Sequence, residues 1–332
     1  MAEFTYSIVI PVYNSALYIE KCLNSILNQD YDKFQVIIVD DGSTDDSLQI
    51  LNDFAKDYPN VIVLSQDNAG PGAARELALK YATGDYIIFS DSDDYWEDNF
   101  LSKINIYIEK YLPDILEFGY RKVELNGRVI SNYPLVNTQY KNDYCIKHYI
   151  NQKNTTNFLW NKVFSKKLFS NVKFLHLYAG EDSAVLLQLF SNAKSYVSIP
   201  EICYNHVMTP LSLCRLPFNM KKLDILKSDD FMYEYLSKKH KDLCEKFAYA
   251  VCARSAILYC ELLLSEDENK NSLKHIIKNQ YKKYRSYIKN PKKASKSFSI
   301  KRKGIVTLFG INPVLCIFAY KIIKKFLSYS LK

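Results

Sequence analysis

The stretch that decides the fold is Tyr86-Ile87-Ile88-Phe89-Ser90-Asp91-Ser92-Asp93-Asp94, an apolar run that ends in a cluster of acids. Such a run is typical of a strand buried on both faces, as in a parallel sheet covered by helices. Three similar runs precede it, and helical patterns separate them: Ser7–Val12, Val36–Val39 and Val61–Leu64. We therefore expect an α/β fold with a mostly parallel sheet, flanking helices and a ligand site at the carboxyl ends of the strands.

The regular alternation of strand and helix patterns ends at about Asp114. The Asn126-Gly127 pair predicts a hairpin within 123–130, and a helix is expected from Asp182 to Phe190. Residues 220–264 show helical spacing throughout. The chain has 332 residues, of which 48% are apolar, which is enough for a buried core. This predicts one large domain with appendages, or two domains.

Charge is distributed unevenly along the chain. Residues 269–332 hold 17 Lys and Arg and no Asp or Glu, so the remainder carries 27 basic against 36 acidic residues, a net charge of −9. A strongly basic extension is expected to bind a polyanion, either nucleic acid or an anionic membrane surface.

Two segments make up this extension. Residues 270–303 are basic with interleaved tyrosines, and residues 305–327 are apolar but interrupted by Asn312-Pro313. An apolar segment too short to span, next to basic residues, suits a helix lying in the membrane interface. The alternative is a helix packed on the body with a solvated charged face. RNA binding ranks third because no recognised RNA module accompanies the run, and no nucleic-acid partner is expected.

The apolar run near the N-terminus, around Pro11, predicts a strand. It does not resemble a signal peptide, because it is short and follows Glu3. No stretch reaches the roughly 18 uninterrupted apolar residues of a spanning helix. The eight cysteines are scattered without a C-x-x-C pair, which favours buried thiols in a reducing compartment. We therefore expect a cytoplasmic protein, peripheral on the inner face of the cell membrane.

The acids after the fourth apolar run suggest a metal site. Asp91 and Asp93 are one residue apart at a strand end, where two carboxylates can hold Mn²⁺ or Mg²⁺ through oxygen. Such a cation would let a diphosphate bind beside carboxylates and would neutralise it as a leaving group. The alternative is an ordinary turn with a helix cap, since Asp and Ser favour both.

Two further loops carry candidate ligand contacts. Asp40 ends the second apolar run, where its carboxylate can accept the N3–H of a uracil ring; an ordinary turn is the alternative. The loop Gly70-Pro71-Gly72-Ala73-Ala74-Arg75 differs from the dinucleotide fingerprint, because Arg replaces the third glycine and the loop follows the third strand. We therefore reject a dehydrogenase, and Arg75 either meets phosphate or is solvated.

Taken together, four stretches closely resemble the family 2 glycosyltransferases of the GT-A fold, of the type that builds bacterial surface polysaccharides such as capsule or lipopolysaccharide. They are Ser7–Asn14, Val39–Asp45, Asn68–Arg75 and Asp91–Asp94. The resemblance covers about the first 100 residues closely and continues more loosely to about residue 215. It implies a nucleotide diphosphate sugar donor, a divalent metal and inversion at the anomeric carbon by direct displacement.

The resemblance also implies site residues. Those implied for the nucleotide sugar are Pro11, Tyr13, Asp40, Asp41, Arg75, Asp91 and Ser92. Those implied for the metal are Asp93, Asp91 and His206. The general base is Asp182, next to Glu181, and the donor or acceptor pocket includes Trp160, Asn161 and Lys162. A carboxylate base is also what the chemistry needs, because an acceptor hydroxyl is a poor nucleophile until its proton is removed. Without the family pattern, Asp182 reads as a helix cap and His206 as a half-buried structural residue.

We expect four segments: a nucleotide-sugar-binding half over 1–119, an acceptor-binding and catalytic half over 120–215, a helical basic extension over 216–303 and an amphipathic membrane segment over 304–332. Polymer-extruding relatives carry several spanning helices and a Q-x-x-R-W stretch, neither of which occurs here. The prediction is therefore transfer of one sugar, from a UDP-hexose or UDP-N-acetylhexosamine, to a glycan or lipid-linked acceptor. A sugar-nucleotide pyrophosphorylase and a non-catalytic nucleotide-sugar-binding membrane scaffold are the alternatives.

Overall fold

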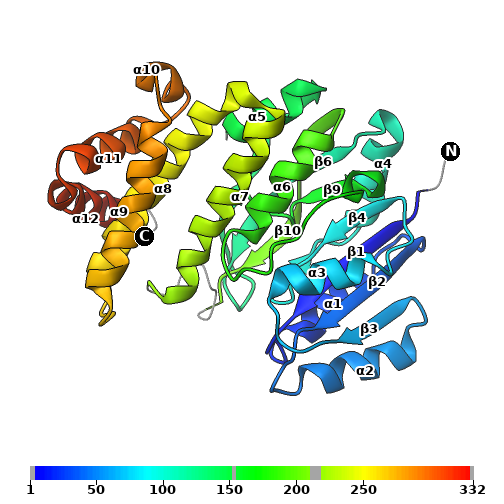
Figure 1. Cartoon of the computed structure of the whole chain (residues 1–332). Coiled ribbons are helices and arrows are strands. Elements are labelled where there is room, and N and C mark those ends of the chain that lie inside the picture. The colour runs from blue at the N-terminus through cyan, green and yellow to red at the C-terminus, as the bar shows by residue number, and fades with distance from the viewer. Residues whose placement is uncertain (1–3, 152–154, 210–217, 330–332) are drawn as a thin grey trace. The chain divides into compact units, whose positions relative to one another are not determined.

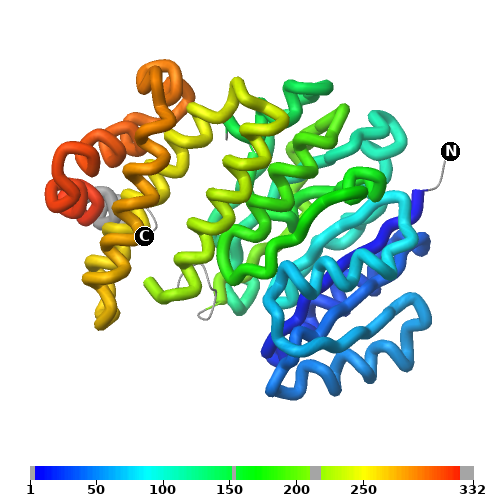
Figure 2. The backbone as a smooth tube through the Cα atoms, viewed as in Figure 1, coloured from blue at the N-terminus to red at the C-terminus, as the bar shows by residue number. Residues whose placement is uncertain are grey.

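The computed structural model describes residues 4–151, 155–209 and 218–329, with side chains up to residue 321. The chain forms two compact units, residues 1–212 and 213–332. The division falls close to residue 216, where the sequence predicts the start of the extension, and Figures 1 and 2 show the path of the chain through both units.

The first unit is built on one ten-stranded sheet. Eight strands follow the order β3-β2-β1-β4-β9-β6-β10-β5, while β7 pairs with β6 and β8 pairs with β10. The neighbours β3, β2, β1 and β4 are parallel, as are β6 and β10, whereas β9 runs antiparallel to β4 and β6. The strands are β1 (Tyr6–Val12), β2 (Phe34–Asp40), β3 (Val61–Ser65), β4 (Tyr86–Phe89), β5 (Tyr95–Trp96), β6 (Ile115–Val123), β7 (Val129–Tyr133), β8 (Thr138–Lys141), β9 (Lys162–Ser165) and β10 (Ser195–Val207). The expected mostly parallel α/β sheet is confirmed.

Helices connect the strands of this unit, and the first three of them connect parallel strands. They are α1 (Ile19–Leu27), α2 (Ser47–Asp57), α3 (Pro71–Leu79), α4 (Phe100–Tyr111), α5 (Asp143–Asn151) and α6 (Glu181–Asn192). In α1 the apolar spacing of Ile19, Cys22, Leu23 and Ile26 buries one face in the core, as an amphipathic helix requires. Strand residues such as Ile8, Ile38 and Ile88 are likewise buried, and they belong to the same core as the buried residues of α1 and α4.

Strand register brings the predicted loops together. In the sheet Val12 pairs with Asp40, and Val9 pairs with Phe89, so β1, β2 and β4 end at the same edge. The polar residues that follow these three strands therefore line one edge, where ligands bind in open parallel sheets. The predicted hairpin is also present, with Gly127 at φ +85° between β6 and β7.

The second unit is helical. Its helices are α7 (Asp224–Lys239), α8 (Cys244–Leu264), α9 (Lys270–Ser286), α10 (Pro291–Ala294), α11 (Ile300–Ile311) and α12 (Pro313–Tyr329). Within the described residues Lys241–Leu264 is the one helical stretch long and apolar enough to cross a membrane, yet 67% of its apolar window is buried. It packs against α7, α9, α11 and α12, so it forms the core of this unit.

Two sequence expectations meet the structure here. The break predicted at Asn312-Pro313 separates α11 from α12, whereas the predicted start of the last segment at 304 falls inside α11. All seven described cysteines are free, and six of them are buried, while Cys214 lies outside the described residues. The Sγ atoms of Cys260 and Cys316 lie 3.8 Å apart.

Candidate active site

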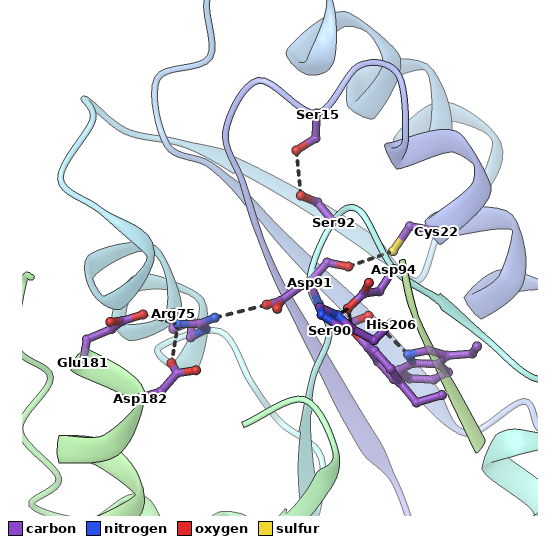
Figure 3. A network of polar contacts seen from close by, with 12 residues as sticks. Ser15, Cys22, Arg75, Ser90, Asp91, Ser92, Asp94, Glu181, Asp182 and His206 are labelled. Carbon is purple, nitrogen blue, oxygen red and sulfur yellow. Dashed lines mark hydrogen bonds and ion pairs between the residues drawn. The ribbon is translucent and has the colours of Figure 1, made fainter. Parts of the chain in front are cut away.

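The acidic loop after β4 is held from both sides by hydrogen bonds. The Ser92 and Ser15 hydroxyls lie 2.7 Å apart, and the Cys22 thiol donates to the Asp91 carbonyl across 3.6 Å. The Asp94 backbone N–H donates to the Asp91 carbonyl, which closes a turn. The loop is thus a turn, as the alternative interpretation supposed, but its side chains enter a wider polar network (Figure 3).

Arg75 on α3 joins this loop to α6. Its guanidinium is nearly buried and donates from Nη2 to Asp91 Oδ1 at 3.2 Å and from Nη1 to Asp182 Oδ1 at 2.8 Å. Glu181 Oε1 lies 3.5 Å from the same Nη1. Figure 3 shows Arg75 between Asp91 and the two acids of α6. One cluster therefore contains four of the predicted site residues, 75, 91, 181 and 182.

Asp182 does not act as the helix cap that local sequence allows. Gly180 occupies the cap position at φ +86°, and no side chain makes a capping hydrogen bond there. The Asp182 carboxylate instead turns to Arg75. The base prediction is thereby compatible with the geometry, because the carboxylate lies in the cluster that contains Asp91.

A close approach of two backbones sets this position. A Cβ added to Gly72 on α3 would lie 2.6 Å from the Leu175 carbonyl oxygen. The segment leading to α6 therefore crosses directly over the start of α3. A hydrogen bond between His176 Nε2 and Glu76 Oε2, 2.9 Å apart, adds a second contact. Gly72 thus serves backbone packing, which explains a glycine in a loop that does not match the dinucleotide fingerprint.

The pKa values of the three carboxylates in the cluster are raised. Burial raises the pKa of Asp182 and of Asp91, although the Arg75 charge opposes both shifts. Burial and the Asp182 charge raise the pKa of Glu181 to about 7. Burial lowers the pKa of Arg75, but the charges of Asp182, Asp91 and Glu181 more than offset it, so the guanidinium remains charged. One cation thus faces three carboxylates.

Asp93 and Asp94 differ sharply although they are neighbours. Asp94 is buried and accepts hydrogen bonds from the Tyr204 hydroxyl at 2.8 Å and the Val207 N–H at 2.7 Å, which ties the loop to β10. Asp93 is partly exposed and accepts from the Thr209 hydroxyl at 3.1 Å. Burial and the Asp94 charge raise the pKa of Asp93 to about 6. Asp94 is therefore structural, while Asp93 keeps accessible oxygen.

His206 is bound to protein on one side. Its Nδ1 lies 3.2 Å from Asp94 Oδ2, and its ring stacks on Trp160 at 5.3 Å. Burial lowers the pKa of His206, but the hydrogen bond and charge of Asp94 outweigh it and raise the pKa. A protonated ring cannot ligate a metal and favours an anion such as phosphate. A metal role for His206, which needs a neutral ring, and a role in binding phosphate, which suits a protonated ring, both stay predictions.

Asp91 and Asp93 have the chemistry of ligands for a divalent cation. Asp91 and Asp93 are hard oxygen donors, they repel each other electrostatically, and the pKa of each is raised. A cation would relieve that repulsion. Among the described residues no group of three or more His, Cys, Asp or Glu could hold a metal by itself. A bound cation here would need further ligands from a substrate or water, which is common for Mg²⁺.

Asp40 and Asp41, at the end of β2, take different roles. Asp40 is buried; Oδ2 accepts from the Ser43 N–H at 3.2 Å, whereas Oδ1 has no hydrogen-bond partner among the described residues. Asp41 Oδ1 accepts from Ala69 N–H at 2.9 Å and Oδ2 from Gly70 N–H at 2.8 Å. Both oxygens of Asp41 thus hold the loop before α3, and its contact with the nucleotide stays a prediction.

The other predicted nucleotide contacts lie at the same edge. Pro11 is in β1, and Tyr13 follows that strand with its side chain 51% exposed, so its ring is available for a ligand. Ser92 is hydrogen bonded to Ser15.

The predicted pocket residues 160–162 are buried. Trp160 stacks on Tyr204 at 4.6 Å, and Lys162 is fully buried with its ammonium 3.3 Å from Glu117 Oε1. The Asn161 amide also donates to Glu117, at 3.2 Å. Asn161 and Lys162 therefore support the site from within the protein, and neither lines an open pocket in this structure.

Sequence reasoning missed Glu117, which gathers this network. Besides Lys162 and Asn161 it accepts from the hydroxyls of Thr155 at 2.7 Å and Tyr196 at 2.9 Å. The available signal was a single acid inside an apolar strand, since a buried charge requires partners. Thr209, which binds Asp93, carries no comparable signal in the sequence.

Comparisons with known proteins bear on the family and on the fold. A family model described as Glycosyl transferase family 2 matches residues 7–173. An uncharacterized glycosyltransferase of Haemophilus influenzae is 34% identical over 238 residues, which cover 67% of this chain and 91% of the relative. The poly(ribitol-phosphate) beta-glucosyltransferase of Bacillus spizizenii is 54% identical over 93 residues, which cover 27% of this chain and only 15% of that enzyme. The crystal structure of S. aureus TarS 1-349 in complex with UDP-GlcNAc superposes with a TM-score of 0.57 at 21% identity, covering 91% of this chain and 78% of that one.

Proposed function

The chain belongs to glycosyl transferase family 2, and from that premise we propose that it moves one sugar, with inversion, from a nucleotide diphosphate sugar to a hydroxyl of a surface glycan or its lipid-linked precursor. The observation that carries the proposal is the cluster in which Arg75 holds Asp182 and Asp91 together. This cluster places a carboxylate that can accept a proton beside a carboxylate that can serve the donor.

Asp182 is proposed as the general base. The acceptor hydroxyl loses its proton to this carboxylate as its oxygen attacks the anomeric carbon, and the nucleotide diphosphate leaves from the opposite face. Burial raises the pKa of Asp182 and so strengthens it as a base, while Arg75 keeps it oriented and ionised. A single displacement of this kind inverts the anomeric configuration.

Asp40 is proposed to select the base of the nucleotide. Its buried Oδ1 lacks a partner among the described residues, and such an acceptor suits the N3–H of uracil. The exposed Tyr13 ring lies after the neighbouring strand β1. The TarS complex with UDP-GlcNAc supports the same donor class. A UDP-hexose or UDP-N-acetylhexosamine is therefore the proposed donor.

Mn²⁺ or Mg²⁺ is proposed to assist at Asp91 and Asp93, which fit a hard cation. When bound, it would neutralise charge on the leaving diphosphate. A protonated His206 would add a positive charge at the same loop, since Asp94 holds its ring there.

The test is a transfer assay with a panel of nucleotide sugars and the Asp182→Asn variant. We expect transfer to fall by about 10²–10⁴-fold, the usual contribution of a general base, with donor affinity unchanged. Lys166→Met, on the exposed start of a 3₁₀ turn, serves as the control. Normal transfer by Asp182→Asn would remove the base assignment. Pyrophosphate release from UTP and a sugar 1-phosphate would instead indicate a pyrophosphorylase, and donor binding without transfer to any acceptor would indicate a scaffold.

The cation is tested by calorimetric titration of the donor with Mn²⁺ or with chelator. Donor affinity should fall in chelator for the unmodified protein, and Asp93→Asn should lose most of this dependence. Equal donor affinity in Mn²⁺ and in chelator would contradict a metal-dependent site.

The proposed location is the inner face of the cell membrane, with the protein peripheral on the cytoplasmic side. The support is the charge of residues 269–332, which include 17 Lys and Arg and no acid. Fractionation of cells that express the full chain would test it, since a peripheral protein leaves the membrane fraction at high salt.

A further inference from the structure

The helical unit displays an apolar stripe where α11 meets α12. Ile311, Val314, Leu315 and Phe318 are 71%, 55%, 48% and 63% exposed. Within α12 the spacing of Val314, Leu315 and Phe318 places them on one side of the helix, and Ile311 is the last residue of α11 before the break at Asn312. Four large apolar side chains exposed together mark an interaction surface, because single exposed residues are common but contiguous patches are not.

The opposite sides of the same helices pack against the rest of the helical unit, which fixes the position of the stripe. Phe309 packs against the rings of Tyr259 and Tyr281 at 5.1 and 4.7 Å, and the Tyr281 hydroxyl donates to the Val306 carbonyl at 2.8 Å. Cys316 is fully buried against Cys260 of α8. The helices therefore already have a core, and the stripe is their outward surface.

The charge around the stripe selects its partner. Lys321 is exposed and lies three residues after Phe318, which continues the stripe into a basic end. Lys301, Arg302 and Lys303 begin α11. No acid occurs between 269 and 332. An apolar stripe with basic ends and no nearby acid in sequence complements an anionic lipid surface, into which the apolar side chains insert while the lysines reach phosphate.

We propose that this corner of α11 and α12, the corner stripe (residues 311, 314, 315 and 318), inserts into the headgroup region of an anionic bilayer. The proposal deepens the peripheral location given above, because it names the side chains that enter the lipid. It does not depend on the sugar-transfer chemistry. A second copy of this chain is the competing occupant of the same stripe.

The experiment is vesicle flotation of the full chain with phosphatidylglycerol-containing and pure phosphatidylcholine vesicles. We expect binding to the anionic vesicles that falls with salt, and Leu315→Gln/Phe318→Gln should weaken it at least tenfold without altering charge. Ile106→Gln is the matched control, because Ile106 is 64% exposed on α4 of the acidic first unit and should leave binding unchanged.

Three outcomes would overturn the proposal. The double variant could bind anionic vesicles as well as the unmodified chain, or the control could lose binding equally. Light scattering could instead show a dimer that the double variant dissociates while vesicle binding persists, which would assign the stripe to a second copy. Transfer to a soluble acceptor is measured in parallel; the double variant should retain it, so loss of lipid binding and loss of catalysis are distinguishable. Thermal unfolding confirms that the variants are folded.

Discussion

The two units each contain an arginine bound to carboxylates, and the clusters differ in their charge. In the sheet unit one guanidinium, Arg75, faces three carboxylates, and the pKa of Glu181 is raised to about 7. In the helical unit Arg254 donates from both Nε and Nη2 to the buried Asp229. This two-point pair suits a structural role. An excess of buried negative charge costs stability, and a protein retains it where a substrate or cation supplies the missing positive charge.

The largest expected effect comes from removing each arginine. Arg75→Met should lower transfer by about 10²–10³-fold because Asp182 loses its orientation, and should destabilise the fold by about 3–5 kcal/mol. Arg254→Met should cost a similar free energy of unfolding but leave kcat/KM of the folded protein nearly unchanged. Urea unfolding and the transfer assay measure both quantities.

Arg75→Lys sharpens the comparison, since lysine keeps the charge but lacks the planar fork that reaches two carboxylates. It should recover stability better than activity. Full activity in Arg75→Met would erase the distinction between the clusters.

A second effect concerns the buried pair of Lys162 and Glu117. Lys162→Met alone should destabilise the protein by about 3–5 kcal/mol, because it leaves a buried carboxylate without its cation. Glu117→Gln added to that variant should restore part of the loss, as measured by unfolding in urea. A double variant less stable than the single one would show that the hydroxyl donors, and not Lys162, are the main partners of Glu117.

A third effect has the opposite sign. The folded pKa of Asp93 is about 6 against 3.8 for an ordinary aspartate, so the folded state binds the proton more tightly than the unfolded state. The metal-free protein should therefore lose stability as pH rises from about 4 to about 6, by about 1–3 kcal/mol for this group. Asp93→Asn should stabilise the protein in chelator at pH 7 and have little effect at pH 4. Denaturation at the two pH values checks this, and a destabilising Asp93→Asn at pH 7 would contradict the charge-excess interpretation.

The smallest effect is expected at the protein surface. Lys283 pairs with Asp230 at 2.9 Å, and both side chains are more than two-fifths exposed. Lys283→Met should change the free energy of unfolding by less than about 0.5 kcal/mol, because solvent screens exposed pairs. A larger loss in thermal or urea unfolding would show that exposure is a poor guide to charge energetics in this unit.

Much of the donor side could be predicted from sequence because it depends on local order. Apolar runs ending in Asp40 and Asp91 place both residues at one edge of a parallel sheet, and that placement is confirmed. What sequence could not supply were partners far apart in the chain. Asp94 meets Tyr204 110 residues later, and Asp93 meets Thr209 116 residues later. Local propensity also favoured a cap at Asp182, which tertiary contact with Arg75 overrode.

The place of β9 in the sheet has a consequence for engineering. This four-residue strand pairs with β4, at the donor edge, on one side and with β6 on the other. Strand β6 is followed in the sheet by β10, which contains His206. Recombination that exchanges residues 115–207 between relatives would carry β9 with the grafted part and leave two seams in the sheet, three residue pairs of β9 against β4 and two of β10 against β5. If the acceptor binds within 120–215 as predicted, such hybrids should change the acceptor and keep the sugar donor of the parent.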